Sequence, residues 1–438
     1  MTRSRPGRST GRSRSRRASP GVDVYLFPAV VGGGLGDIEE VLAAGRELAR
    51  SGFPIVLYRR PGRPLPRSVD GPWDWPPIER RDRLAPRAPA ALTVTPAWGI
   101  SAAPSRPEAF GRGGPWGAEC ADVERAYGVD STLHVSLEEF ARTLPSARED
   151  RERLREGGVA RRDLATRLAR SRADGELEEF RDAFARFRAF DRPNVLHLFA
   201  GFERNARFAR EYPAAVQTGP LWSRRFRRAP RTARSGEWVW YASPGSAERL
   251  AVRVLAGLSA DDTAVRLYVR SPREWKFAVP PERGTVDTGP IRTGAWRRRF
   301  ARADLRIVTG SRTLLEAIER GGPFLYFNGT LAEGRRSRRH RPEKIAALLS
   351  VLRRRGADPA LIRDLADFAR GHRTREIVER AARRADGWAR FPRDVRPIGF
   401  RAPYDDAGHL IAGVARALRE RPHDAVSIVA RVRAGSPA

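Results

Sequence analysis

The sequence predicts an α/β protein built from two Rossmann-like, doubly wound parallel sheets. Short apolar runs alternate with amphipathic helical segments, which is the pattern of strands and crossover helices in such sheets. A stretch rich in Pro, Gly and Arg at 220–236 divides the pattern into two halves. We therefore expect a basic disordered tail at 1–20, a first domain at 21–225, a second at 236–395 and a helical segment at 396–438.

The first half opens with a complete strand–loop–helix–strand unit. Val22–Val31 is rich in β-branched and aromatic residues and predicts a buried strand, and Gly32–Asp37 (GGGLGD) is a glycine loop. Ile38–Arg50 carries its apolar residues on one helical face, with Asp37 as the expected N-cap. Phe53–Tyr58 follows as the next strand. Such a unit needs a right-handed crossover, which places both strands in a parallel sheet.

The rest of the first half is less regular. The region 59–120 is rich in Pro, Gly, Arg and Trp and gives no ordered pattern, whereas Leu137–Phe187 is highly charged and predicts helix. Two short apolar runs, Asn194–Gly201 and Ala214–Thr218, predict further strands.

The second half repeats the alternation more clearly. Strands are expected at 237–242, 264–269, 285–287, 305–308 and 323–328, and helices at 246–258, 293–303 and 313–320. The segment 342–438 is expected to be mostly helical.

Composition limits the classes of protein. The chain has 438 residues, with 83 Lys and Arg against 52 Asp and Glu and a formal net charge of +31, so polyanions, acidic membrane surfaces and phosphorylated substrates are natural partners. Cys120 is the only cysteine, which excludes an internal disulfide and a cysteine-based metal site. No stretch reaches 18 consecutive apolar residues, so no transmembrane helix is expected. We expect a cytoplasmic protein, or one peripheral at the inner face of the cell membrane.

Three loops that lead into the N-termini of predicted helices are the candidate binding sites, at 32–37, 243–246 and 309–313. In open α/β sheets, ligands lie off the carboxyl ends of the strands, where helix N-termini favour phosphate. In the third loop, Ser311 and Thr313 offer hydroxyls and Gly310 permits close approach. Glu316 follows one turn into the helix, where a carboxylate accepts two ribose hydroxyls or, alternatively, only stabilises the helix dipole.

Two residues of the first half are candidate catalytic groups. Asp37 is either the N-cap of its helix or a carboxylate facing an interdomain cleft. His197, inside a predicted strand, is either a proton acceptor in that cleft or a core histidine. The remaining histidines have no metal-ligand spacing, so no metal site is expected.

The stretch ADLRIVTGSRTLLEAIERGGPFLYF resembles the donor-binding segment of GT-B glycosyltransferases. It is most similar to the N-acetylglucosaminyltransferase family that completes the lipid-linked peptidoglycan precursor. The shared features are Ala303-Asp304, Gly310, Thr313, Glu316 and Gly322-Pro323. The glycine loop before Asp37 is similar to the acceptor-side loop of that family and to the Gly-Gly-Leu-Gly-Asp of starch and glycogen synthases, although the peptidoglycan family has a catalytic histidine where Asp37 stands.

The resemblance implies a role for each matching residue. Glu316 would bind the nucleotide ribose, while Ser311 and Thr313 would face the diphosphate. The other binding residues that the resemblance implies are Ile291 at the uracil edge, Gly245 and Ser246 in the second glycine loop, and Gly34 and Gly36 in the first glycine loop. Asp37 would be the general base or would orient the acceptor, and the C-terminal helical segment would pack back on the first domain.

The resemblance therefore implies a metal-independent glycosyltransferase without a cofactor. A nucleotide-diphosphate sugar, UDP by preference, is the expected donor, and the acceptor is a hydroxyl, with a lipid-linked acceptor and an anionic membrane surface as candidate partners. Two alternatives stay open: a polyanion- or nucleic-acid-binding protein on the same fold, and a sugar-nucleotide epimerase. Nucleic acid is the weaker alternative, because aromatic residues are not interleaved with the arginines.

Overall fold

The computed structural model describes 15 stretches of the chain. They are 21–27, 36–58, 79–81, 83–96, 117–139, 192–206, 209, 214–224, 237–242, 264–269, 285–288, 293–327, 343–383, 391 and 395–438. The predicted tail at 1–20, the end of the predicted strand at 22–31, most of the predicted glycine loop at 32–37 and most of the predicted helix at 137–187 lie outside them. No helix within these stretches is long and apolar enough to cross a membrane.

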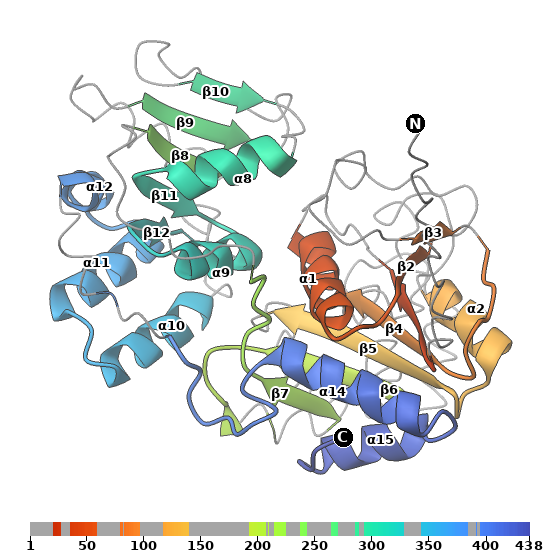
Figure 1. Cartoon of the computed structure of the whole chain (residues 1–438). Coiled ribbons are helices and arrows are strands. Elements are labelled where there is room, and N and C mark those ends of the chain that lie inside the picture. Colours follow the sequence, from red (N-terminus) through yellow and green to blue (C-terminus); the bar gives the residue numbers. More distant parts are fainter. Residues whose placement is uncertain are drawn as a thin grey trace, which may run out of the picture.

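The first domain is built on a parallel sheet of seven strands with the order β3-β2-β1-β4-β5-β6-β7 (Figure 1). The strands are β1 (Asp23–Leu26), β2 (Ile55–Tyr58), β3 (Glu79–Arg81), β4 (Ala91–Pro96), β5 (Thr132–Glu139), β6 (Val195–Ala200) and β7 (Ala215–Thr218). The order reverses at β1, which is the mark of a doubly wound sheet.

The two faces of this sheet differ in polarity. One face carries aliphatic side chains such as Val94, Val135 and Leu198. It is covered by α1 (Gly36–Arg50), α14 (Ala407–Glu420) and α15 (Ala425–Arg433), so helices from opposite ends of the chain share one core (Figure 1). The other face carries buried tyrosine, threonine and histidine side chains, and α2 (Gly117–Tyr127) packs on β4 and β5 there.

The second domain is built on a parallel sheet of five strands with the order β10-β9-β8-β11-β12. The strands are β8 (Glu237–Ala242), β9 (Ala264–Val269), β10 (Thr285–Thr288), β11 (Leu305–Val308) and β12 (Phe324–Tyr326). Its helices are α8 (Thr293–Arg302), α9 (Ser311–Arg320), α10 (Glu343–Arg354), α11 (Pro359–Arg370) and α12 (Thr374–Arg383). The order reverses at β8, so this sheet is doubly wound as well.

The predicted fold class, α/β with two Rossmann-like doubly wound domains, is confirmed by these two sheets. The prediction of a helix from Leu137 is wrong at its start, because Leu137 to Glu139 belong to strand β5. The sequence Thr132–Glu139 alternates Leu133, Val135 and Leu137 with polar residues, which is the period of a half-apolar strand. The charged residues after it hid that alternation.

The chain crosses between the domains twice, and the two crossings run side by side. The first crossing follows β7 at Gly219, and the second leads into α14 through Tyr404. The Gly219 N–H donates to the Tyr404 carbonyl at 2.7 Å. Near Ile398 the second crossing also exchanges backbone hydrogen bonds with Phe202 (2.9 Å) and Arg204 (3.1 Å). The hinge between the domains is therefore a small backbone ladder.

Candidate functional site

The strand order locates the candidate site. Ligands of doubly wound sheets bind at the carboxyl ends of the strands, where the order reverses. In the second sheet this point lies between β8 and β11, and α9 begins directly after β11. In Figure 1, α9 lies between the second sheet and α1 of the first domain, and α9 contacts α1. The start of α9 is therefore placed both at a switch point and at the domain interface.

Hydrogen bonds between Gly310 and Thr313 hold the first turn of α9. Gly310 is the N-cap in an extended conformation and has no side chain to cap the helix. Its N–H donates to the Thr313 hydroxyl oxygen at 3.2 Å, and that hydroxyl donates to the Gly310 carbonyl at 3.0 Å. Thr313 thus shapes the turn that presents the helix N-terminus, and its contact with a diphosphate stays a prediction. The helix begins at Ser311, two residues earlier than the sequence predicts.

Glu316 is buried in α9, with 5% of its surface exposed. It lies one turn after Arg312, and its negative charge acts on the Arg312 guanidinium. In this arrangement of the domains, a ribose reaches Glu316 only if neighbouring atoms move. Glu316 lies where the sequence expects it along the helix, and its contact with ribose stays a prediction.

Arg312 connects α9 to the first domain. Its Nη1 donates to Glu139 Oε1 at 2.9 Å and to the Leu221 carbonyl at 2.6 Å. Glu139 is the last residue of β5, so the carboxyl end of a central strand of the first sheet meets the first turn of α9. Burial alone would lower the pKa of Arg312, but the charges of Glu139, Glu319 and other acids outweigh it and raise the pKa. Arg312 is therefore a charged, buried link between the domains.

A second link joins the far end of α9 to the hinge. Glu319 accepts hydrogen bonds from the Ser223 hydroxyl and from the Arg224 N–H, the latter at 2.9 Å. Arg224 also forms ion pairs with Glu47 of α1 at 3.2 Å and with Asp406 at 3.0 Å. Helix α9 is thus attached to the first domain at both ends.

His197 is a core histidine in this structure. It has no exposed surface, and its Nδ1 lies 3.0 Å from the Ser136 hydroxyl oxygen. Burial, helped by the charge of Arg433, lowers its pKa to about 3. A neutral imidazole closed off from solvent does not fit the catalytic role that the sequence left open, because a base must reach the proton it removes. The alternative reading, a structural histidine, fits the geometry.

A second buried histidine belongs to a similar network. His134 lies 2.6 Å from the Thr93 hydroxyl and 3.0 Å from Glu124. Burial acts to raise the pKa of Glu124, but hydrogen bonds with His134, Asn194 and Arg192 lower it to about 2. The chain Thr93–His134–Glu124 has the connectivity of a nucleophile, base and acid, yet Thr93 is 0% exposed and His134 is 1% exposed. We assign it to the polar core beneath α2.

Several predicted site residues lie outside the described side chains. Gly34, Gly245, Ser246 and Ile291 are not described, and only the backbone of Gly36 and Asp37 is. Because α1 begins at Gly36, Asp37 lies within the first turn and is not the N-cap. An acid in this position suits the helix dipole. Among the described residues, no group of three or more His, Cys, Asp or Glu side chains could hold a metal ion.

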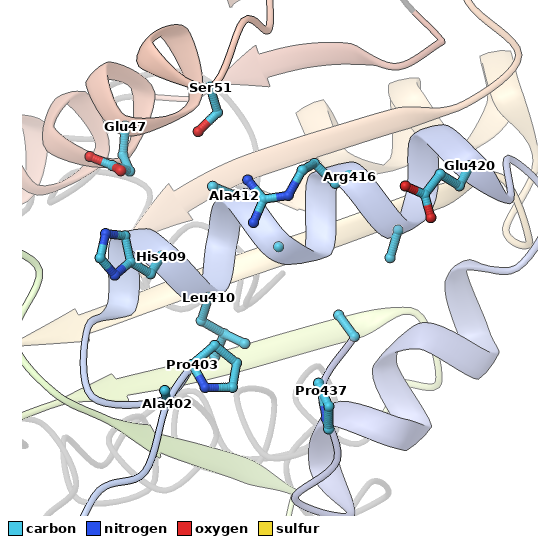
Figure 2. A pocket seen from close by; sticks show the side chains of 13 residues that line it. Glu47, Ser51, Ala402, Pro403, His409, Leu410, Ala412, Arg416, Glu420 and Pro437 are labelled. Carbon is cyan, nitrogen blue, oxygen red and sulfur yellow. The ribbon is translucent and has the colours of Figure 1, made fainter.

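A cavity of about 570 Å³ lies away from this site, between α1, α14 and the second crossing. Figure 2 shows Arg416 of α14 reaching toward the end of α1, with Glu47 and His409 at one end of the cavity and Glu420 farther along α14. Ser51 at the end of α1 and Pro403 of the second crossing also line it. The end of α1 lies toward the amino ends of the strands, so the cavity is not at the edge where a doubly wound sheet binds its ligand.

The residues that join the domains carry no recognisable signal in the sequence. Arg312 was visible as the one basic residue in the loop at 309–313, but nothing in the pattern indicated its partner. Glu139 fell in a segment predicted as helix, and Arg224 was one of six arginines in the predicted linker. Interdomain contacts of this kind depend on two distant parts of the chain and leave no local period.

Two doubly wound parallel sheets, with the carboxyl end of one meeting the first turn of helix α9 of the other, make this an α/β protein of two Rossmann-like domains. No protein-family model and no curated protein sequence matches the chain.

Solved structures with a similar arrangement include three glycosyltransferases. The glycotransferase of kitacinnamycin is 14% identical, with 83% of this chain and 99% of that chain covered and a TM-score of 0.37. A UGT transferase from Siraitia grosvenorii in complex with UDP is 12% identical, with 94% and 99% of the two chains covered and a TM-score of 0.44. WaaG, a glycosyltransferase involved in lipopolysaccharide biosynthesis, is 12% identical, with 84% and 97% of the two chains covered and a TM-score of 0.41.

Proposed function

We propose that the protein is a metal-independent glycosyltransferase that moves a sugar from a nucleotide-diphosphate sugar to an acceptor hydroxyl. The observation that carries the proposal is the start of α9, a helix N-terminus at the switch point of the second sheet whose N-cap, Gly310, has no side chain. Such a terminus presents backbone N–H groups and a partial positive charge, which suit a diphosphate. The sequence around it, with Gly310, Thr313 and Glu316, supports the same choice of ligand.

In the proposed reaction, the acceptor oxygen attacks the anomeric carbon of the donor sugar as the bond from that carbon to the diphosphate breaks. The electron pair leaves with the diphosphate, and the N–H groups of the first turn of α9 stabilise its charge. Asp37, in the first turn of α1, is the proposed acceptor of the hydroxyl proton. UDP is the preferred nucleotide, with Ile291 at the uracil edge and Glu316 at the ribose. A lipid-linked acceptor and an anionic membrane surface belong to the same proposal.

Nucleotide binding by a Glu316→Ala variant tests the donor site. Calorimetric titration with UDP should show binding by the wild-type protein. Hydrogen bonds to a charged group contribute about 1.5–3 kcal/mol, so the variant should bind UDP at least about tenfold more weakly. Glu376→Gln, on α12, is the control and should bind as the wild type does. Equal affinities of wild type and Glu316→Ala would contradict the site assignment.

A polyanion-binding function is the second candidate, and helix α8 favours it. The sequence of α8, TGAWRRRFAR, carries four arginines and no acid over ten residues. A polyanion site of this kind loses affinity steeply with salt. The UDP titration is therefore repeated with inorganic polyphosphate at low and high salt. Binding of every anion, lost at high salt, would favour this candidate over the glycosyltransferase.

A further inference from the structure

The geometry points to Arg312 as an interdomain latch that gates donor access to Glu316. This inference rests on the proposed function only for the identity of the donor. Arg312 is rooted in the first turn of α9, and Glu316 follows one turn later on the same helix. Both side chains are at least 95% buried in the arrangement seen here, with exposed fractions of 3% and 5%. Residues four apart lie on the same face of a helix, so an opening movement that separates α9 from the first domain would expose the face that carries both.

Only part of the Arg312 guanidinium forms hydrogen bonds. Nη1 donates to Glu139 and to the Leu221 carbonyl, both on the side of the first domain. Nε and Nη2 are buried and have no hydrogen-bond partner among the residues that the structure describes. A buried donor without a partner costs about 1–3 kcal/mol, because it has given up its hydrogen bonds to water. Opening would hydrate these two nitrogen atoms and recover that cost.

The charges around Arg312 favour the closed arrangement, because they stabilise its guanidinium where it is buried. Besides Glu139, three acids act on it: Glu316 and Glu319 of its own helix and Glu39 of α1. Glu319 is held by Ser223 and the Arg224 N–H, and Glu39 forms an ion pair with Arg46 at 3.4 Å. Arg312 thus lies among carboxylates from both domains, two of which have other partners as well. It holds the domains together, but the incomplete bonding keeps this closed arrangement reversible.

The hinge allows the movement. The crossings at Gly219 and Tyr404 are joined by backbone hydrogen bonds. Breaking the Arg312–Glu139 pair leaves this ladder intact, so the domains can rotate about it without unfolding. For a donor that binds only the open form, the apparent association constant is the intrinsic constant multiplied by the fraction of open molecules. Weakening the latch should therefore tighten donor binding, whereas a merely structural role for Glu139 would loosen it.

Two variants and a distance measurement test the latch. Glu139→Gln keeps the shape of the side chain and removes its charge, and Arg312→Gln removes the guanidinium. Spin labels on Val129→Cys in the first domain and Arg363→Cys in the second report the interdomain distance by pulsed electron resonance. The native Cys120 is buried and its thiol pKa is raised to about 12, so it stays unlabelled.

The latch predicts a longer and broader distance distribution in both variants than in the otherwise unaltered labelled protein. It also predicts that Glu139→Gln binds UDP about three- to tenfold more tightly than the wild type. Arg312→Lys, which keeps the charge, should stay closer to the wild-type distribution. Arg380→Gln breaks an ion pair between α11 and α12 and is the control that should change neither readout.

Unchanged distances in a folded Glu139→Gln protein would overturn the latch, as would weaker or equal UDP binding by that variant. If Arg312→Gln does not fold, Glu139→Gln decides alone. Failure of the wild type to bind UDP would refute the proposed function, and the distance measurement would still decide whether Arg312 holds the domains together.

Discussion

Gly219 marks the point where the two interdomain crossings touch, and replacing it by alanine should disrupt the hinge. A Cβ at this position would lie 1.8 Å from the Asp405 carbonyl oxygen, 2.5 Å from its carbonyl carbon and 2.8 Å from Pro397 Cγ. Real Cβ atoms essentially never approach closer than 3.0 Å. Two of the three atoms belong to the backbone and have no rotamer to change. The second crossing would therefore have to move by more than 1 Å.

The cost follows from what that movement breaks. The Gly219 N–H donates to Tyr404 at 2.7 Å, and a hydrogen bond of this kind contributes about 1 kcal/mol. Forcing extra volume into a packed site costs about 1–3 kcal/mol more. We expect the free energy of unfolding of the first domain to fall by about 3 kcal/mol. The Tyr404 hydroxyl donates to the Val432 carbonyl at 3.1 Å, so the strain also reaches α15.

Urea unfolding followed by circular dichroism measures this change. Gly413→Ala is the matched control, because among the described residues, the backbone of its own helix and its chain neighbours aside, only Arg416 Nη2 lies within 4 Å of a Cβ there, at 3.9 Å. Gly413 lies inside α14, where alanine is favoured over glycine by about 0.5–1 kcal/mol, so this variant should gain stability. A Gly219→Ala protein as stable as the wild type would refute the reasoning from the crossings.

Two further predictions concern buried groups of the first domain. His197 stays neutral down to a pKa of about 3, whereas the unfolded chain takes up its proton near pH 6.5. Stability should therefore fall as pH drops, by about 2–3 kcal/mol between pH 6.5 and 4.5, and His197→Gln should lose that part of the pH dependence in urea titrations. A pH dependence unaltered in the variant would contradict the buried neutral state. Cys120 should not react with a thiol reagent at pH 8 until the protein is unfolded in urea, because burial raises its pKa to about 12; rapid reaction of the folded protein would show the thiol to be accessible.

The sequence predicts strands best where a short run of apolar residues stands apart from its polar neighbours. Asn194–Gly201 and Leu305–Val308 are short runs of apolar residues, and the structure confirms strands in both places. Strand β4 was missed because Ala91–Pro96 lies in a stretch rich in Pro and Arg, although Leu92 and Val94 alternate with threonines. Its stability comes from pairing with β1 and β5, which no local pattern reveals.

The positions of the candidate site residues in the sequence could be predicted, but their burial and their partners in the fold could not. Gly310, Thr313 and Glu316 lie at the start of α9 as the motif implies. The burial of Glu316 and the pairing of Arg312 with Glu139 come from the packing of two domains against each other, across 173 positions of sequence. The choice between a core and a catalytic His197 needed the same information, because a strand pattern does not tell which face of a sheet is covered.

The sharing of one core by helices from both ends of the chain has a consequence for how the protein is made. The first sheet is complete once β7 has left the ribosome, but its aliphatic face still lacks α14 and α15. Leu410, Ile411 and Val414 reach that face only after the whole second domain has been synthesised. The domain that begins first is therefore the last to be finished, and during the interval its bare face is a target for chaperones. The second domain, whose described core draws on a continuous part of the chain apart from Phe202, has no such wait.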